Sequence, residues 1–317
     1  MNPNEITSRV THGNYDLEKV LRKMAFGLGT PFGVGNVYYV IPSTDASYVD
    51  FVKNYDKKYS DSSSLVQTTL SGAMSASVAS RHDVIYLAPG YSETVTSALT
   101  FSKADVSLIG LGEGNQRAVI TGNGTIDAIT LTGAGVRIEN IKFAAPGTDD
   151  QTADINVAAA GCVIRNTHHI GSQTSKNKTD IITVASGGDD LLVDGVRAYN
   201  TVVDCVSFLS LEAAVARAEV KNCYVAGTFS TGALMDEATA TLAYIHHNVF
   251  KNTKAATAVV TFTTGNSTGV MSHNFCSGRH TTIASNVVAG TGMDFHENYV
   301  VEEAALNGLY IPAQDAD

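Results

Sequence analysis

The amino-acid sequence predicts an all-β chain, wound as a right-handed parallel β-helix of about nine coils with an N-terminal capping helix and a short helical arm. Three observations predict this fold. Similar segments recur along the chain at steps of 26, 29, 27, 26, 26 and 24 residues. Each segment alternates apolar and polar residues with the period of two that is typical of a strand. No single segment could bury its apolar face alone, so successive copies must stack.

The copies share one pattern of positions. An apolar residue, a variable residue and a second apolar residue come first. A charged residue follows, then Asn or Gly, and then another apolar residue. Four copies are clear: Val136–Phe143, Cys162–His169, Leu191–Ala198 and Ala218–Val225. Three later segments look like further copies: Tyr244–Phe250, Val270–Cys276 and Met293–Val300. The plan predicts a ladder of turn residues, one per coil: Asn140, Asn166, Gly195, Asn222, Asn248, Asn274 and Asn298.

The repeat length alone also suits a leucine-rich repeat, but that pattern needs several leucines per copy, whereas these copies use Val, Ile, Ala and Cys. The parallel β-helix is therefore favoured. Asn suits its turns because the side chain tolerates the left-handed backbone region and can bond to its counterpart one coil away. In the last three copies a register shifted back by one residue fits the apolar pattern better and places His247, His273 and Glu297 at the turn. Both registers remain open at this stage.

The segments before the repeats supply the first coils and their cover. Val84–Gly90 and Val106–Gly110 are expected to form the first two coils, and residues 62–80 a capping helix with its apolar residues largely on one face. Residues 14–26 have helical spacing and lead into a glycine-rich stretch, so this helix could dock on a partner or on its own body. The expected divisions are an arm over 1–35, a cap subdomain over 36–80, the β-helix over 81–300 and a tail over 301–317.

Composition excludes several classes of protein. With 31 acidic and 21 basic residues the formal net charge is −10, which disfavours a nucleic-acid partner bound through its phosphates. No stretch reaches 18 apolar residues, and the first residues lack the plan of a signal peptide, so we expect neither a membrane partner nor secretory export. The four cysteines, Cys162, Cys205, Cys223 and Cys276, have no metal-binding spacing and are expected to be reduced and mostly buried.

A resemblance to known proteins follows from several of these segments. The run Asp83–Thr94, the Val106–Gly110 segment and the coils resemble the pectate-lyase-like superfamily of right-handed β-helices. The glycine-rich lead, Val37–Ser43 and the run Ala79–Tyr86 look like the β-helix proteins that tailed bacteriophages carry in their virions. The resemblance covers about residues 28–300 and implies the fold. For the role it is suggestive, because such proteins include capsid decorations, spikes and polysaccharide depolymerases.

Some proteins of the resembling superfamily are enzymes, so the residues that their catalysis requires are compared with those of this chain. Pectate-type lyases use acidic residues that hold Ca²⁺ and a basic residue that removes a proton, and glycosidases use two carboxyls. Asp194 and Arg197 are the best acid and base that the chain offers. However, the position before the turn is occupied by residues of alternating charge, which attract one another when stacked and need no catalytic explanation: Glu139, Arg165, Asp194 and Lys221.

Two other groups are candidate metal ligands. The adjacent pairs Asp149/Asp150 and Asp189/Asp190 could hold Ca²⁺, although neither fits a spaced calcium loop and solvated loop residues are the favoured interpretation. Four histidines fall in consecutive coils near the same turn, where a polar column or a protein contact is favoured over a metal site: His246, His247, His273 and His296. We therefore expect no metal and no cofactor.

These observations favour a non-enzymatic structural protein of a tailed-phage virion, a decoration or cement protein on the outer capsid surface. Its expected partners are the major capsid protein or another virion protein. The resemblance implies a homotrimer, made in the host cytoplasm. The main alternative is a tail spike or fibre-like protein that binds or cleaves a host polysaccharide, so a saccharide ligand stays possible. A free secreted carbohydrate lyase is the third hypothesis, which the missing signal peptide disfavours.

Overall fold

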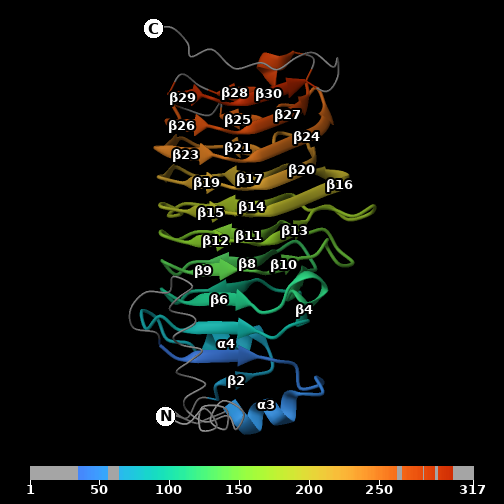
Figure 1. Cartoon of the computed structure of the whole chain (residues 1–317), viewed down its shortest axis with the longest axis vertical. Helices are drawn as coiled ribbons and strands as arrows, with labels where there is room; N and C mark the ends of the chain where they lie inside the picture. The colour runs from blue at the N-terminus through green and yellow to red at the C-terminus, as the bar shows by residue number, and fades with distance from the viewer. Residues whose placement is uncertain (1–34, 56–63, 263–265, 281, 290–291, 303–317) are drawn as a thin grey trace, which may run out of the picture. The chain divides into compact units, whose positions relative to one another are not determined.

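The structure of the protein is a computed structural model that describes residues 35–55, 64–262, 266–280, 282–289 and 292–302. The chain folds as a right-handed parallel β-solenoid of about nine turns with very little helix, which confirms the predicted fold class (Figure 1). It divides into two compact units, Met1–Tyr91 with Lys103–Ala118 and Ser92–Ser102 with Val119–Asp317. The predicted arm helix over 14–26 and nearly all of the predicted tail lie outside the described residues.

The first unit holds four parallel strands in the order β2-β1-β3-β6. Their bounds are β1 Val37–Val40, β2 Val66–Gln67, β3 Val84–Leu87 and β6 Ser107–Gly110. The strands β3 and β6 come from the two segments in which the sequence predicts the first coils, and they pair in register. The remaining elements are the helices α3 Tyr48–Tyr55 and α4 Leu70–Ala76 and the 3-10 turn η1 Gly114–Gln116. The ring of Tyr39 packs on Phe51 and on Tyr86, with centroid distances of 5.2 and 5.8 Å, so α3 covers β1.

The capping helix is shorter than the prediction of residues 62–80, which was wrong in its extent. Helix α4 spans only Leu70–Ala76, and Val66 lies in strand β2 instead. The helix begins after Thr69, whose hydroxyl oxygen accepts a hydrogen bond from the backbone N–H of Gly72 at 3.1 Å. It ends at Ser77, whose backbone is extended. Local capping therefore limits the helix to about two turns, although the apolar spacing continues beyond both ends.

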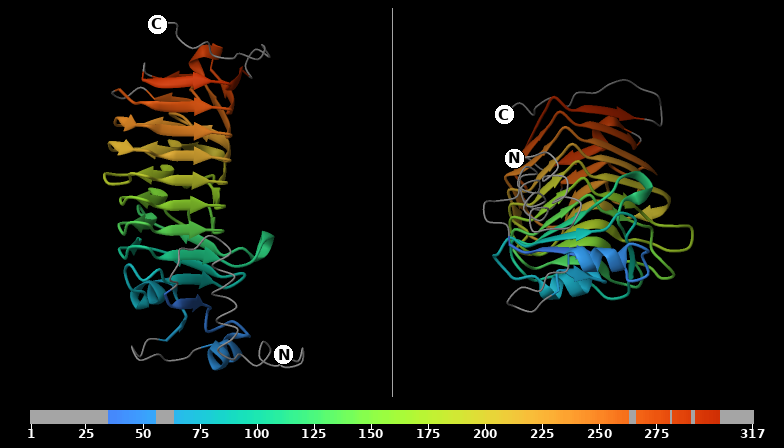
Figure 2. Two further views of the ribbon diagram at one scale, coloured as in Figure 1. Left: turned by 60° about the vertical axis from the view of Figure 1, so that its left-hand side comes forward. Right: turned by 60° about the horizontal axis from the view of Figure 1, so that its bottom comes forward.

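The second unit winds through three parallel sheets, and each coil adds one strand to each sheet (Figures 1 and 2). Sheet A of this unit contains β9 Arg137–Glu139, β12 Val163–Arg165, β15 Leu192–Asp194, β19 Glu219–Lys221, β23 Ala243–His246, β26 Gly269–Ser272 and β29 Met293–His296. Sheet B contains β4 Ser92–Val95, β7 Val119–Gly122, β10 Lys142–Phe143, β13 His168–Ile170, β16 Arg197–Cys205, β20 Tyr224–Phe229, β24 Val249–Ala255, β27 Phe275–Arg279 and β30 Tyr299–Glu302. Sheet C contains β5 Leu99–Phe101, β8 Asp127–Leu131, β11 Ala153–Val157, β14 Asp180–Val184, β17 Ser207–Leu211, β21 Leu234–Asp236, β25 Val260–Phe262 and β28 Val287–Ala289.

Two smaller elements complete this unit. A two-stranded sheet pairs β18 Val215–Ala216 with β22 Ala240–Thr241, and a 3-10 turn, η2, spans Ile283–Ser285.

The core of the second unit is built from columns of similar side chains, because parallel in-register pairing places equivalent residues of successive coils above one another. The inward column of sheet A is Ile138, Ile164, Val193, Val220, Ile245 and Met271. The inward column of sheet C is Ile129, Ile155, Ile182, Leu209, Leu234 and Val260. All of these side chains are buried, and each contributes about 1.5–3 kcal/mol of hydrophobic stabilisation.

A single residue in the left-handed region turns the chain from sheet A to sheet B in every coil. In the first four coils this residue is Asn140, Asn166, Gly195 and Asn222, with φ of 57°, 49°, 66° and 55°. In the last three coils it is His247, His273 and Glu297, with φ of 56°, 57° and 55°. The turn ladder therefore has to be corrected at Asn248, Asn274 and Asn298, since the register shifted by one residue is the one that the chain adopts. These three asparagines follow the turn and point inward, where their amides bond to one another.

Candidate functional site

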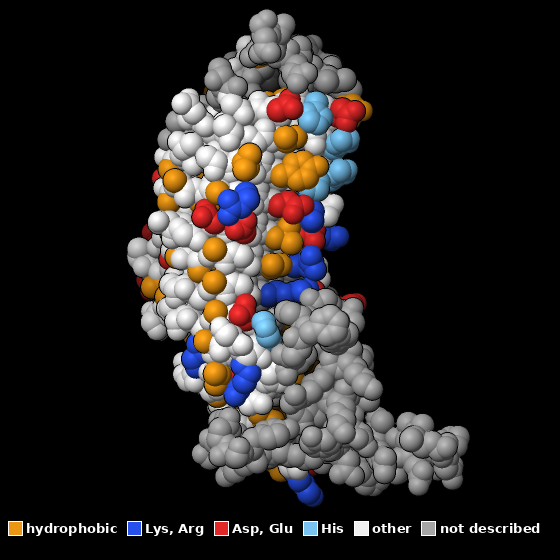
Figure 3. All heavy atoms as spheres, turned by 90° about the vertical axis from the view of Figure 1, so that its left-hand side faces the viewer, with side chains coloured by type: hydrophobic (Ala, Val, Ile, Leu, Met, Phe, Trp, Pro, Cys, Tyr) orange, Lys and Arg blue, Asp and Glu red, His pale blue; other side chains and the backbone are white. Residues whose placement is uncertain are grey.

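The outer face of sheet A carries the charged residues and histidines that the sequence singles out (Figure 3). The register of the strands resolves them into two straight columns. One column is Arg137, Val163, Leu192, Glu219, Tyr244, Val270 and Asp294. The other is Glu139, Arg165, Asp194, Lys221, His246, Ser272 and His296. The predicted alternation of charge thus lies in a single column over four coils.

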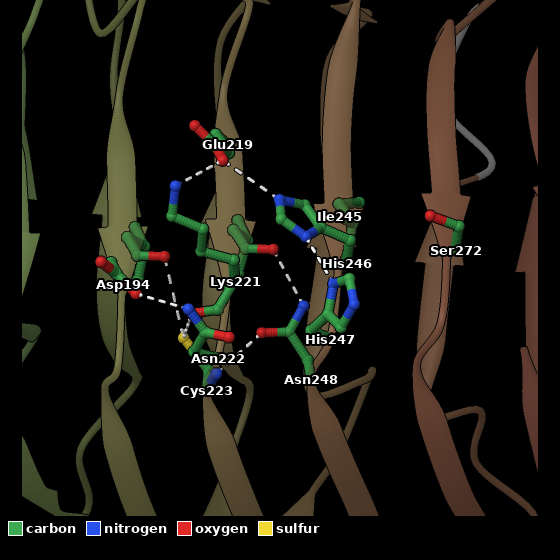
Figure 4. Close-up of polar contacts among 12 residues, drawn as sticks. Asp194, Glu219, Lys221, Asn222, Cys223, Ile245, His246, His247, Asn248 and Ser272 are labelled. Atoms are coloured by element: carbon green, nitrogen blue, oxygen red, sulfur yellow. Dashed lines mark hydrogen bonds and ion pairs between the residues drawn. The ribbon is translucent and has the colours of Figure 1, made fainter.

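Asp194 uses both carboxylate oxygens in contacts with neighbouring coils. Arg165 Nε lies 3.2 Å from its Oδ2. Asn222 Nδ2 donates to its Oδ1 at 2.9 Å (Figure 4). Arg197 begins strand β16 of sheet B, beyond the turn at Gly195, and so it points from a different sheet. Among the described residues, no hydrogen bond or ion pair joins the two residues proposed as acid and base. Asp194 binds one coil to the next.

Glu139 and Lys221, the other charged residues of this series, form ion pairs within their own strands and not with the neighbouring coils that the sequence predicts. Glu139 is bonded to Arg137, two residues earlier in the same strand, with Nε and Oε2 2.8 Å apart. Lys221 Nζ bonds Glu219 Oε1 at 2.7 Å in the same way. Among the four described residues of this predicted charge series, Arg165 and Asp194 are the pair that bonds between coils as expected. All of these pairs are partly exposed, so each stabilises the fold by well under about 1 kcal/mol.

The acidic loop pairs also bond to their own neighbouring coils. The N–H of Asn177 donates to Asp150 Oδ1 at 2.9 Å, and the N–H of Ala216 donates to Asp189 Oδ1 at 2.7 Å. Asp190 forms a two-pronged ion pair with Arg217 at 2.5 and 2.8 Å, which lowers the pKa of Asp190. These contacts explain most of the carboxylates as links between coils.

The four histidines are near one another but do not share a common centre. His246 Nδ1 and His247 Nδ1 are 2.8 Å apart (Figure 4). The rings of His247 and His273 stack with centroids 4.9 Å apart at an interplanar angle of 1°. His246 Nε2 also bonds Glu219 Oε1 at 3.1 Å, and His273 Nε2 bonds Glu297 Oε2 at 2.6 Å. His296 lies further along, 3.6 Å from Asp294. Among the residues that the structure describes, no three His, Cys, Asp or Glu side chains are arranged to hold a metal ion.

Glu219 bonds to Lys221 in its own strand and to His246 in the next coil. Burial alone would raise the pKa of its carboxyl, but hydrogen bonds from Lys221 and His246 outweigh burial and lower that pKa. The carboxylate is therefore held in its charged form by these two neighbours. A carboxylate whose pKa is lowered accepts a proton less readily, so Glu219 is poorly suited to act as a general base.

All four cysteines are free and buried, which confirms the expectation of reduced, buried thiols. Burial raises the pKa of Cys162 to about 11 and those of Cys223 and Cys276 to about 12, and it also raises the pKa of Cys205. A thiol with so high a pKa is almost entirely protonated near neutral pH and is a poor nucleophile.

A buried polar cluster in the second unit was not predicted from the sequence. Lys178 Nζ lies 2.7 Å from Asp154 Oδ1 and donates to the carbonyl oxygens of Ile170 at 2.7 Å and Ala144 at 3.1 Å. His169 bonds Asp154 Oδ2 through Nδ1 and Thr167 Oγ1 through Nε2, both at 2.9 Å. The side chains of Lys178, Asp154 and His169 are each at most 1% exposed.

The histidine of this cluster is affected by its burial. Burial lowers the pKa of His169 and, despite the opposing effect of Asp154, the net shift is downward. At neutral pH the ring is therefore neutral, and the ion pair of the cluster is the contact between Lys178 and Asp154. Thr167, His169 and Asp154 form a chain of hydrogen bonds from a hydroxyl through an imidazole to a carboxylate, as in a catalytic triad. All three residues are buried inside the coils, so this hydroxyl has no access to a substrate. Lys178 of the cluster is bonded to the backbone at the ends of β10 and β13, through the carbonyl oxygens of Ala144 and Ile170.

Carboxyl groups next to sheet C are the remaining polar feature. Asp180 is 4% exposed and accepts a hydrogen bond from Ser207 Oγ at 2.7 Å. Burial raises its pKa to about 6 from 3.8, with a further contribution from the charge of Glu237. Burial and then the charges of Asp180, Glu237 and Asp127 also raise the pKa of Glu212. This group of acids is an electrostatic cost to the fold at neutral pH.

The variant Asp180→Asn is therefore expected to raise the free energy of unfolding at pH 8 by about 2 kcal/mol, because an amide keeps the contact with Ser207 without a buried charge. The folded pKa of about 6 exceeds the unfolded value of 3.8, so the folded state holds its proton more tightly. The penalty for the charged form is absent below about pH 4 and complete above about pH 6. Denaturant unfolding at pH 4 and pH 8 measures the difference, and an equal gain at both pH values would contradict this explanation.

No helix among the described residues is long and apolar enough to cross a membrane. Comparison of the chain with protein-family models, with curated proteins and with solved structures finds no match.

Proposed function

We propose that this chain is a structural protein of a tailed-phage virion, bound to the outer surface of the capsid as a decoration or cement protein and assembled as a homotrimer. The observation that carries the proposal is that the residues with potential catalytic or metal-binding chemistry are engaged in contacts that hold the coils together. Asp194 and the acidic loop residues form coil-to-coil contacts, and Arg197 points from a different sheet. Such a chain offers rigid faces for assembly.

The surface charge also suits this role. With a net charge of −10 the protein repels packaged nucleic acid and other negatively charged material outside the particle. The resemblance of about residues 28–300 to virion β-helix proteins supports the same assignment. The capsid protein or another virion protein is the proposed partner.

A chain without residues 1–35 is expected to lose its binding to capsids while its body stays folded, because the proposal assigns attachment to the arm. The measurement is co-sedimentation of the full-length and shortened chains with capsids stripped of the protein, and circular dichroism checks the fold of both chains. Undiminished binding of the shortened chain would remove the arm from the proposal.

Failure of the full-length chain to bind any capsid, together with cleavage of capsular or acidic polysaccharides, would favour the spike alternative instead. Electron microscopy of particles made with and without the chain locates the protein directly. Added density on the outer capsid surface is the expected result, and density on the tail would contradict it.

A further inference from the structure

The buried cluster of the second unit holds an amine and a carboxyl group in direct contact. Lys178 Nζ lies 2.7 Å from Asp154 Oδ1, and the two side chains are 0% and 1% exposed. A lysine amine is a nucleophile that forms covalent bonds with carbonyl carbons. When it condenses with a carboxyl group, one water molecule leaves and an amide remains. The cluster therefore contains both reactants of an amide bond.

Hydrogen bonds fix the direction of the amine. Lys178 Nζ donates to the carbonyl oxygens of Ile170 at 2.7 Å and Ala144 at 3.1 Å, so its third N–H is the one left for Asp154. The lone pair that remains after loss of this proton therefore points toward the carboxyl group. Asp154 Oδ1 is held in turn by Gln151 Nε2, which donates to it at 3.1 Å. Reactants that are well oriented within one molecule react as if at about 10⁵–10⁸ M.

The exclusion of water favours the reactive forms of both groups. In water an amine and a carboxyl group are charged near neutral pH, and an ammonium nitrogen has no lone pair with which to attack. A buried site withdraws the solvation that stabilises the two ions, so moving one proton from the ammonium to the carboxylate costs less there. The resulting amine and carboxylic acid are the forms that condense to an amide.

His169 supplies a donor to the second oxygen of the same carboxyl group. Its Nδ1 lies 2.9 Å from Asp154 Oδ2, and its Nε2 lies 2.9 Å from Thr167 Oγ1. A carboxylate oxygen can only accept, so the neutral ring carries its proton on Nδ1 and accepts from the Thr167 hydroxyl. The ring is held by stacking on Phe143, with centroids 4.8 Å apart. This N–H lies where negative charge develops when an amine attacks the carboxyl carbon.

We propose that Lys178 and Asp154 join in an intramolecular amide bond that the folded chain forms by itself. One proton passes from Nζ to Oδ1, and Nζ then bonds to Cγ of Asp154. His169 stabilises the charge that develops on Oδ2. A second proton passes from Nζ to Oδ1, the bond between Cγ and Oδ1 breaks, and Oδ1 leaves as water while Oδ2 becomes the amide oxygen. The amide nitrogen keeps the third proton, which it donates to Ile170 O.

The reaction needs no external substrate, oxidant or cofactor, so the burial of the cluster does not prevent it. The structure shows the two groups in contact, before the bond forms. The bond would join β11 to the segment that leads into β14, which is the neighbouring strand of sheet C. Unlike an ion pair, it would persist in denaturant. The inference does not depend on the proposed attachment to capsids.

The experiment measures the mass of the purified, denatured full-length protein. The wild type is expected to be lighter than its sequence by one water molecule, whereas Lys178→Arg and Asp154→Ala should have the full mass of their sequences. Lys178→Arg keeps a cation beside Asp154, and its guanidinium group does not form the amide. Trypsin does not cut after a lysine whose amine is in an amide. Its digest of the wild type should therefore contain one branched peptide that joins residues 143–165 to residues 177–197.

A variant of the histidine tests the assigned donor. His169→Phe keeps an aromatic ring to stack on Phe143 but cannot donate to Asp154. Removal of one such donor is expected to slow formation of the bond by about 10²-fold, which is measured as the linked fraction at equal times after synthesis. An unchanged rate would exclude His169 from the reaction.

The matched control lies in the same chain. Lys221 Nζ and Glu219 Oε1 are also 2.7 Å apart, but these side chains are 25% and 34% exposed, so the same digest should contain their peptides unlinked. A wild type that is folded by circular dichroism and has its full sequence mass would overturn the inference. Loss of one water molecule that persists in Lys178→Arg would also overturn it, because the lost water would then come from another group.

Discussion

Replacing Lys178 with methionine is expected to lower the free energy of unfolding by about 3–5 kcal/mol. Methionine nearly matches the volume of the lysine stem but removes the ammonium group from a site with no access to water. Asp154 would then keep a buried charge without its cation, and the carbonyl oxygens of Ile170 and Ala144 would lose a donor. Denaturant unfolding followed by circular dichroism at neutral pH measures the change.

The matched control is Lys221→Met, which also removes a lysine from an ion pair with a carboxylate at 2.7 Å. Lys221 and Glu219 are 25% and 34% exposed, so water replaces the lost partner and the expected cost is below about 1 kcal/mol. The double variant Asp154→Leu/Lys178→Met should be less destabilised than the sum of the two single variants, because neither charge is then left alone. An equal loss of stability in Lys178→Met and Lys221→Met would contradict the explanation, because it would show that burial does not determine the contribution of the Lys178–Asp154 ion pair.

The sequence could predict the solenoid because the repeat depends on local patterns that recur. The inward column of sheet A consists of the same Ile and Val positions that the alternation identifies, from Ile138 to Ile245. The left-handed turn was predictable at Asn140, Asn166 and Asn222, since Asn is the residue that tolerates that conformation best after glycine.

The later turns could not be decided from residue preference alone. Either His247 or Asn248 could occupy the turn, and preference for the left-handed region favours the asparagine. Burial decides the other way, because Asn248 is 2% exposed and bonds within the coils, while His247 reaches the surface. The hydrogen bonds of the asparagines to other coils are long-range, so no local pattern shows them.

The buried cluster could be predicted only in part. His169 occupies the inward position of its copy, equivalent to Phe143 and Ala198 in neighbouring coils, and its ring stacks on Phe143 at 4.8 Å. The alternation therefore places this histidine inside. Lys178 lies in a polar loop, and nothing in its neighbourhood indicates that the loop folds over an aspartate of the preceding coil. Asp194 and Arg197 are close in sequence but lie in different sheets, because the turn at Gly195 separates β15 from β16.

Three inward asparagines of the last coils, Asn248, Asn274 and Asn298, bond to one another in a ladder. After the Lys178 cluster, we expect this ladder to make the next largest contribution to stability. Asn274 Nδ2 donates to Ile245 O, Ser272 O and Asn298 Oδ1, all at 2.9 Å. Its Oδ1 accepts from the N–H and from Nδ2 of Asn248 at 3.0 and 2.9 Å. The side chains of all three asparagines are at most 2% exposed, so water cannot replace these partners.

Asn274→Ala is therefore expected to lower the free energy of unfolding by about 3 kcal/mol or more, because it leaves several buried donors and acceptors without partners at once. Asn166→Gly is the matched control. Its amide is at the surface, where it donates to Asn140 Oδ1 at 3.3 Å, and glycine adopts its φ of 49° without strain, so a loss below about 1 kcal/mol is expected. Thermal and denaturant unfolding of the two variants beside the wild type measures both losses. A comparable loss in the two would contradict the distinction between turn asparagines, which satisfy the backbone, and inward asparagines, which hold adjacent coils together through buried amides.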